Sequence, residues 1–412
     1  MPTDPATRQI WFINAAHVVC HYMLLILATA VLGMVSMDGA RFGTEYGPVL
    51  ALGTGMFVLY GVGSLPMGWI EGRVGRHALM AAFFLGVGAS LVLAGFVSGP
   101  WGLAVALALA GLFNAIYHPI GTAMLVEAAG DRVGRAMGNN GVFGNIGVSF
   151  APVVTALVVA QAGWRWAFIV PGILALILGL LWLREPMYDA RKHAKNARPF
   201  PEIPRDIVRR AVISLMLMAV ASGFVFNAFT LLVPKLMQER LADSPSLLPV
   251  VGVLAFVATL FGGLTQFTVG RMIDRTTLRR VFLPLALAQV PALLALSFLG
   301  GWAVLPVAAI AAASIFGQVT VNETMTARYI APALRAKLYS IRFFVGFLGA
   351  AAASPLVGYL HDVTGNLGLV MIVLAAFGSV ALSCALLFPD RPEELRPELW
   401  AAQARPVALP AE

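Results

Sequence analysis

The chain has 412 residues, of which 59% are hydrophobic and only 12% are charged, and its formal net charge is +8. Soluble globular domains carry about 25% charged residues, so this composition excludes a soluble enzyme, a disulfide-rich secreted scaffold and a disordered chain. The mean hydropathy of +0.84, together with apolar runs of about 20 residues, predicts a protein that crosses a membrane many times.

Twelve apolar runs predict twelve transmembrane helices. They lie at residues 10–36, 46–70, 78–98, 101–126, 137–161, 166–184, 210–234, 247–270, 280–299, 302–328, 337–360 and 366–388. The first run is too long for the apolar core of a signal peptide, so we interpret it as the first span. Cys20 and Cys384 lie inside runs near opposite ends of the chain, without the spacing of a metal site or a redox pair, and we expect buried free thiols.

The positions of the basic residues predict the orientation in the membrane. With both termini on one side, that side holds 24 of the 28 Lys and Arg residues. The other side holds only Arg41, Arg165, Lys235 and Arg240. By the positive-inside rule both termini are cytoplasmic, in a multi-pass protein of the cell inner (cytoplasmic) membrane. We expect the positive charge to contact membrane lipid rather than nucleic acid, and we expect a monomer.

An internal repeat divides the chain into two halves. Gly68 opens the string GWIEGRVGR after the second span, and Gly270 opens GRMIDRTTLRR after the eighth, 202 residues later. The same offset relates Arg135 to Lys337, Gly144 to Gly346, Gly147 to Gly349 and Gly163 to Gly365. Parallel repeats of this kind are related by an axis along the membrane normal and place a transported substrate at their interface. We therefore expect Gly68 and Gly270 in equivalent cytoplasmic turns.

The predicted fold is an all-α integral membrane protein with twelve transmembrane helices in two pseudo-symmetric six-helix bundles. The first bundle covers residues 1–184 and the second covers residues 210–390. Residues 185–209, with six basic residues and four prolines, form a cytoplasmic linker, and residues 391–412 form a cytoplasmic tail. The glycines that recur from Gly138 to Gly147 in the fifth span favour close helix packing, of the kind that a sliding interface between the halves needs.

With this repeat, the chain resembles the major facilitator superfamily over nearly its whole length. That family has a G-x-L-x-D-R-x-G-R-R type motif after its second span, and Gly68, Arg73, Gly75 and Arg76 match it. Gly72 stands at the aspartate position, preceded by Glu71. The second copy keeps the acid and its neighbour as Asp274 and Arg275, and has Thr277 at the later glycine position.

The resemblance implies that these motif residues gate the cytoplasmic side. A carboxylate there can cap the positive end of a neighbouring helix, and we expect Asp274 to contact the start of the fifth span near Arg135. The candidate gating residues are Glu71, Arg73, Arg76, Arg135, Asp274 and Arg275. A charged turn that only sets the topology is the alternative interpretation.

A finer resemblance lies in the first and fourth spans. AHVVCHYMLL in the first span and NAIYHPIGTAMLVEAAGDRVGRAMG, from Asn114 to Gly138, are similar to the fosmidomycin-resistance-like branch with its YHPxG motif. The G-P-x-x-G-G string of antiporters is missing, because the fifth span reads GVFGNIGVSFAP from Gly141 to Pro152. Transport is therefore predicted, and its direction stays open.

Three histidines lie inside predicted spans, where ionisable groups are costly and usually functional. Asn14, His17 and His21 follow i, i+3, i+7 spacing, and so do Gly111, Asn114 and His118 in the fourth span. The family resemblance implies that spans one, four, seven and ten line a central cavity. At 1.5 Å per residue His21 lies roughly 16 Å deep and His118 roughly 13 Å deep, so we expect the two stripes to meet.

Three interpretations of these histidines compete. At least one of them couples proton movement to transport, since the pKa of histidine suits a proton carrier. Alternatively, they carry a transition-metal ion or metal complex, although no carboxylate or cysteine accompanies them at that level. In the third interpretation they are neutral and hydrogen-bonded between packed helices.

The second half supplies other candidate substrate- or proton-binding residues. Asn227 in the seventh span, and Gln318 and Asn322 in the tenth, can orient a substrate by hydrogen bonds. Glu323 and Arg342 are the only strongly charged pair predicted at depth. They form either a structural salt bridge or a site where Glu323 carries a proton.

Together these features predict a secondary active transporter that moves a small-molecule substrate by alternating access, with protons as the coupling ion. No nucleotide-binding motif and no H-E-x-x-H or G-x-S-x-G string occurs, so an ion gradient rather than a cofactor or a chemical reaction is expected to drive it. A metal carrier and a drug or metabolite exporter are the alternatives.

Overall fold

The computed structural model describes residues 4–129, 133–186, 202–241, 247–396 and 399–400. Within these ranges, twelve helical segments are long and apolar enough to cross a membrane, which confirms the predicted number. The first half consists of α1 (Pro5–Met37), α2 (Gly39–Phe42), α3 (Tyr46–Ala51), α4 (Thr54–Ser64), α5 (Met67–Val74), α6 (Arg76–Phe96), α7 (Pro100–Asn114), η1 (Tyr117–Gly121), α8 (Thr122–Ala129), α9 (Val133–Ala162) and α10 (Trp164–Trp182).

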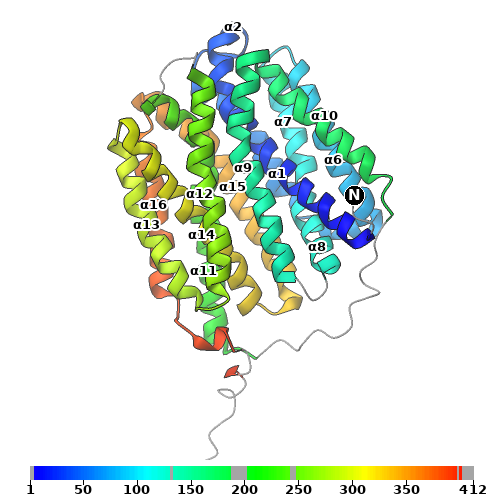
Figure 1. Cartoon of the computed structure of the whole chain (residues 1–412), viewed down its shortest axis with the longest axis vertical. Helices are drawn as coiled ribbons and strands as arrows, with labels where there is room; N and C mark the ends of the chain where they lie inside the picture. Colours follow the sequence, from blue (N-terminus) through cyan, green and yellow to red (C-terminus); the bar gives the residue numbers. More distant parts are fainter. Residues whose placement is uncertain (1–3, 130–132, 187–201, 242–246, 397–398, 401–412) are drawn as a thin grey trace, which may run out of the picture.

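The second half repeats the pattern with longer unbroken helices. It consists of α11 (Arg205–Leu241), α12 (Leu248–Ile273), α13 (Leu278–Phe298), η5 (Gly301–Ala303), α14 (Val304–Tyr329), α15 (Pro332–Thr364), α16 (Gly368–Leu387) and η6 (Pro392–Glu394). The two halves lie side by side, with α9 of the first against α12 of the second (Figure 1). We call the end of the bundle that carries α2 the α2 end, and the opposite end, where the segment after α16 lies, the tail end.

The fourth span is interrupted by a π-helical turn, η1, between α7 and α8. Pro119 lies inside this turn. Because proline has no backbone N–H and its ring clashes with the carbonyl four residues earlier, an α-helix cannot continue undisturbed through this position. Single π-helical turns are often found at functional sites, and this one carries His118.

The backbone angles of certain glycines reflect the internal repeat. Gly163 and Gly365, which are related by the 202-residue offset, both have positive φ angles, of 87° and 72°. Residues with a Cβ rarely adopt such angles, so glycine is needed at both positions. Gly75 also has a positive φ of 82°, whereas its counterpart Thr277 has a φ of −69°. Threonine is therefore tolerated in the second copy.

One expectation about the repeat is wrong in detail. Gly68 lies inside the short helix α5 and Gly270 lies near the end of α12, so neither glycine forms a turn. The chain reverses a few residues later, at Gly75 in the first copy and after Asp274 in the second. A single glycine with an ordinary φ does not stop a helix. The 202-residue offset therefore relates two helix ends rather than two turns.

At the α2 end the halves touch through glycines. A Cβ atom on Gly358 of α15 would lie only 2.6 Å from the Cα of Gly47 of α3. Farther along, a Cβ atom on Gly252 of α12 would lie 2.8 Å from the carbonyl oxygen of Pro152 of α9. Glycine permits this close backbone approach because it has no side chain. The α2 end is therefore closed by direct packing of the two halves.

Part of the predicted C-terminal tail is packed against the second half. Glu394 is 6% exposed and accepts hydrogen bonds from the backbone N–H of Leu278, at 2.8 Å, and from Arg328 Nη1, at 3.2 Å. The hydroxyl of Tyr329 also donates to Glu394. Trp400 is 2% exposed beside the same tyrosine. The carboxylate caps the start of α13 and ties it to the end of α14.

Replacing Glu394 by alanine is expected to destabilise the second half by about 3 kcal/mol, because buried donors then lose their acceptor. Burial also raises the pKa of Glu394. A raised pKa in the folded state gives stability that is present at low pH and lost as the pH rises through it. Thermal unfolding of the detergent-purified protein should show the wild type losing stability relative to Glu394→Gln as the pH rises above 4.5, the ordinary pKa of a glutamic acid. Parallel pH profiles for both proteins would contradict this account.

Candidate functional site

Three histidines of the first half lie close together. His17 and His21 lie on α1, and His118 lies on η1. Their ring centroids are 4.8 Å apart for His17 and His21, 5.4 Å for His17 and His118, and 5.6 Å for His21 and His118. One ring nitrogen from each lies within 4.8 Å of the others. The expectation that the two histidine stripes meet at one level is confirmed, and we call these three residues the histidine cluster.

His17 is held in one orientation by a network from α9. Its Nδ1 lies 2.7 Å from the carbonyl oxygen of Asn140, which can only accept, so Nδ1 donates and Nε2 carries the free lone pair. The Asn140 amide donates to Asn14 Oδ1 at 2.9 Å and to the Tyr117 hydroxyl at 3.0 Å. Asn14 therefore supports the cluster through Asn140.

Asn114 has a structural contact instead. Its Nδ2 donates to the carbonyl oxygen of Cys20 at 3.2 Å, tying α7 to α1. The thiol of Cys20 is fully buried and lies 3.2 Å from the Tyr60 hydroxyl. Cys20 and Cys384 are both free, as predicted.

Glycines of α9 make the space for the cluster. A Cβ atom on Gly144 would lie 2.6 Å from the Cε1 atom of the His17 ring, and one on Gly147 would lie 3.2 Å from the Cβ of His21. These glycines thus pack against α1 of their own half, which corrects the expectation of a glycine interface between the halves. Gly141 does face the other half, since a Cβ atom on it would lie 3.9 Å from Gln266 Oε1.

The second half covers the cluster with aromatic rings from α15. Phe343 is stacked on His118, with ring centroids 5.0 Å apart and planes inclined by 19°. Phe347 lies against Tyr60, at 3.8 Å between centroids. The histidine cluster therefore lies where the two halves meet, and a movement of α15 changes what covers it.

The candidate residues of the second half do not join this cluster in the contacts of the described residues. Asn227 donates to the carbonyl of Gly223 in its own helix, at 2.8 Å. Gln318 is 1% exposed and is hydrogen-bonded to Gln289 of α13. Asn322 is 6% exposed. Gln318 thus lies inside the second half.

The predicted charged pair at depth is present. Arg342 Nη2 of α15 lies 3.3 Å from Glu323 Oε1 of α14, and its Nη1 donates to the hydroxyl of Thr326 at 2.8 Å. The Arg342 side chain is 12% exposed and that of Glu323 is 34% exposed. The carboxylate is therefore the more exposed member of the pair.

The motif residues at the tail end lie at helix ends, with Glu71 and Arg73 in α5 and Arg76 at the start of α6. Glu71 forms an ion pair with Arg76, and Arg73 lies 3.5 Å above the centre of the Trp69 ring. Asp274 and Arg275 are exposed. The side chain of Arg135 lies outside the described residues, so the expected contact between Asp274 and the fifth span stays a prediction.

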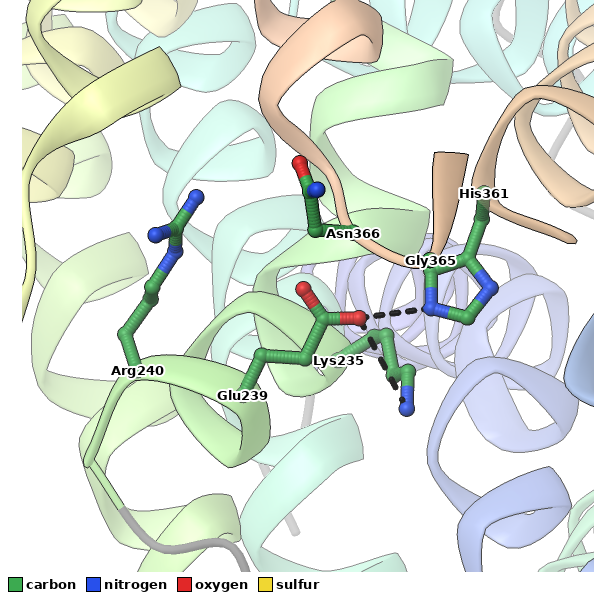
Figure 2. Close-up of a pocket in the computed structure, with 6 residues that line it drawn as sticks. All are labelled: Lys235, Glu239, Arg240, His361, Gly365 and Asn366. Carbon is green, nitrogen blue, oxygen red and sulfur yellow. Dashed lines mark hydrogen bonds and ion pairs between the residues drawn. The ribbon is translucent and has the colours of Figure 1, made fainter. Parts of the chain in front are cut away.

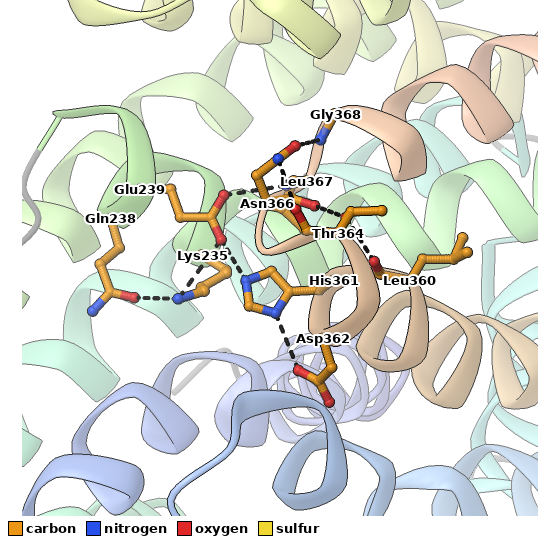
Figure 3. Close-up of polar contacts among 10 residues, drawn as sticks. All are labelled: Lys235, Gln238, Glu239, Leu360, His361, Asp362, Thr364, Asn366, Leu367 and Gly368. Atoms are coloured by element: carbon orange, nitrogen blue, oxygen red, sulfur yellow. Dashed lines mark hydrogen bonds and ion pairs between the residues drawn. The ribbon is translucent and has the colours of Figure 1, made fainter.

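A second polar group, which no local sequence pattern indicates, lies at the α2 end. It lines a cavity of about 340 Å³ (Figure 2). The lining residues are Lys235, Glu239, Arg240, His361, Gly365 and Asn366. Glu239 lies 2.6 Å from Nε2 of His361 and 3.7 Å from Nζ of Lys235 (Figure 3). Its other oxygen accepts from the backbone N–H of Leu367 at 3.3 Å.

The first half contributes an aromatic ring to this second polar group. The ring of Tyr46 lies 5.3 Å from that of His361, and Nζ of Lys235 lies 5.3 Å from the centre of the Tyr46 ring. Tyr46 directly precedes Gly47, where the two halves touch. The charged group and the glycine contact thus form one closed region at the α2 end.

Comparisons with known proteins agree with this architecture. The sequence model described as the Major Facilitator Superfamily matches residues 11–263 and 244–410. The uncharacterized MFS-type transporter YfnC of Bacillus subtilis is 25% identical over 300 residues, which cover 68% of this chain and 69% of YfnC. The multidrug resistance protein MdtG of Serratia proteamaculans is 23% identical over 249 residues, or 59% of each chain.

A solved structure shares the fold over the whole chain. It is a bacterial homolog of the human lysosomal transporter Spinster, in an inward-facing and unoccupied conformation. The TM-score is 0.65 at 12% sequence identity, and the match covers 99% of this chain and 100% of the other. At this identity the similarity shows the fold alone.

Proposed function

Since the chain belongs to the Major Facilitator Superfamily, a family of multi-pass transporters of small solutes, we propose that it is a secondary active transporter driven by a proton gradient across the cytoplasmic membrane. Its two halves alternate between opening at the tail end and opening at the α2 end. The observation that carries the proposed transport site is the histidine cluster at the junction of the halves, covered by Phe343 of the other half.

We place the tail end in the cytoplasm. Both termini then lie on the side with 24 of the 28 basic residues, as the positive-inside rule requires. In this orientation the α2 end faces outward, and the contact between Gly47 and Gly358 closes it. The state described here is thus closed to the outside.

The solute binds at the histidine cluster, and the coupling proton is carried by Glu323. Within the described residues no Asp, Glu or Cys accompanies the three histidines, so a proton bound there would lack a counter-charge. Glu323 is a carboxylate inside a span, paired with Arg342. When the pair separates during the transport cycle, the carboxylate loses its counter-charge and takes up a proton more readily.

Transport by purified protein in proteoliposomes tests this function. Small solutes, including transition-metal salts and amphipathic drugs, are first screened for thermal stabilisation of the protein, because binding to the folded state raises its melting temperature. We expect a stabilising solute to accumulate inside the vesicles when a pH gradient is imposed, and to be released by a protonophore. Binding without flux would identify a receptor instead, and chemical conversion of the solute would identify an enzyme. The sign of the required gradient distinguishes import from export.

A further inference from the structure

We propose that the histidine cluster is the binding site for the transported solute itself, and that this solute is a transition-metal ion of the zinc, nickel or copper type. The proposal rests on the transporter function above and narrows it to a class of substrate. It is carried by the position of three imidazole rings, contributed by α1 and η1, with one ring nitrogen from each within 4.8 Å of the others.

The donor atoms select the class of ion. Within the described residues the group consists of imidazole nitrogens only. Imidazole suits zinc, copper and nickel, whereas magnesium and calcium prefer carboxylate, carbonyl and water oxygens. The nearby rings of Tyr117 and Phe343, with centroids 5.1 Å from His17 and 5.0 Å from His118, make walls that offer a hard ion few ligands.

The orientation of His17 fits a metal ligand. Ligating histidines usually donate their second ring N–H to a carbonyl or carboxylate, which fixes the ring and leaves the other nitrogen for the metal. His17 donates from Nδ1 to the Asn140 carbonyl at 2.7 Å, and the Asn140 side chain is itself hydrogen-bonded to Asn14 and Tyr117. This supporting set leaves Nε2 of His17 available for an ion.

The spacing of the rings fits an ion that is bound and released. Zinc–nitrogen bonds of about 2.0–2.1 Å in a tetrahedral site place the nitrogens about 3.3 Å apart. The nitrogens of the cluster, within 4.8 Å of one another, must therefore move closer when the ion enters. Three protein ligands leave a fourth position open, unlike the closed four-ligand sites that hold a structural ion.

Closure of the cluster also explains how an ion acts on the other half. His118 is stacked on Phe343 of α15, so a shift of its ring toward the ion changes a contact between the halves. The ring of His17 is packed against α9 at Gly144 and is held by its hydrogen bond to the Asn140 carbonyl. We therefore expect the movement to be made by His118 and His21, on the side that faces the second half.

Metal binding by the detergent-purified full chain tests this proposal without a transport assay. After removal of bound metal by a chelator, we expect one zinc ion per chain by titration calorimetry, and a cobalt complex with the visible absorption of a tetrahedral site. His118→Gln and His21→Gln should each weaken zinc binding by at least about tenfold. His77→Gln is the matched control, because His77 is hydrogen-bonded to the carbonyls of Trp182 and Glu185, away from the cluster.

His118→Cys separates ligation from folding. Cysteine and glutamine both remove the ring that packs against Phe343, but only cysteine can ligate the ion. The cysteine variant should retain zinc binding and show a new sulfur-to-cobalt charge-transfer band. The proposal is overturned if zinc does not bind, if His118→Gln and His21→Gln bind zinc as the wild type does, or if the cysteine variant gives no such band.

Zinc flux into proteoliposomes then tests the role as cargo. If zinc binds at the cluster but another solute is transported and zinc is not, the cargo assignment fails. If zinc binds as expected and no solute crosses under any gradient, the site stands and the transporter function fails. The two proposals therefore fail in distinguishable ways.

Discussion

Glu323→Gln is expected to abolish accumulation of the solute against its gradient while leaving exchange across the membrane intact. Glutamine keeps the size and a hydrogen-bonding oxygen toward Arg342, but it cannot release or take up a proton. One pH unit is worth about 1.4 kcal/mol, so a carrier that moves one solute per proton accumulates its solute about tenfold. The variant should reach only equal concentrations on both sides. Uptake into proteoliposomes with and without a pH gradient, compared with counterflow of labelled solute, measures both properties.

Glu185→Gln serves as the matched control for this experiment. Glu185 is also paired with an arginine, Arg8, at 3.0 Å near the tail end of the bundle, and its replacement should leave accumulation unchanged. If Glu323→Gln still accumulates solute with normal pH dependence, the coupling proton is bound elsewhere. The histidines, which the sequence also predicted as proton carriers, would then be the next residues to replace.

Replacing Gly358 by alanine is expected to hold the α2 end open. The new Cβ atom would lie 2.6 Å from the Cα of Gly47, a distance that backbone atoms cannot tolerate, so α3 and α15 must separate. Val49 is fully buried next to this contact. A cysteine at position 49, in a chain whose two native cysteines are replaced by alanine, should then react at least about tenfold faster with an impermeant thiol reagent, which corresponds to a shift of about 1.4 kcal/mol.

Gly99→Ala provides the comparison, because a Cβ atom at Gly99 meets nothing within 4 Å. Transport should slow in Gly358→Ala, since closing the α2 end is part of every cycle, and should be normal in Gly99→Ala. An unchanged labelling rate in Gly358→Ala would show that the helices adjust locally and that this contact does not control opening.

The features predicted correctly from the sequence are those that depend on neighbouring residues. Span number follows from runs of apolar residues, and the meeting of His21 with His118 follows from helical periodicity and depth. Gly163 and Gly365 mark the repeat because a left-handed backbone requires glycine at both places.

The features that were missed depend on contacts between distant segments. Asn140 lies 123 residues from His17, and His361 lies 122 residues from Glu239. Nothing in either local sequence indicates such partners. The sequence predicts Gln318 at the central cavity. In a span that is apolar all round, however, the pattern does not show in which direction a polar side chain points. Glu394 was assigned to a tail because its burial depends on donors from α13 and α14.

The π-helical turn in the fourth span has a consequence for how such carriers diverge. A π-helical turn holds about one residue more than an α-helical turn, and one residue of an α-helix corresponds to a rotation of about 100°. Deleting Pro119 from Tyr117–Gly121 would remove both the extra residue and the proline, so that a regular α-helix could form through this position. The span would still cross the membrane, but His118 would no longer point at His17 and His21. One codon gained or lost at this turn can thus change the specificity of a descendant without a new fold.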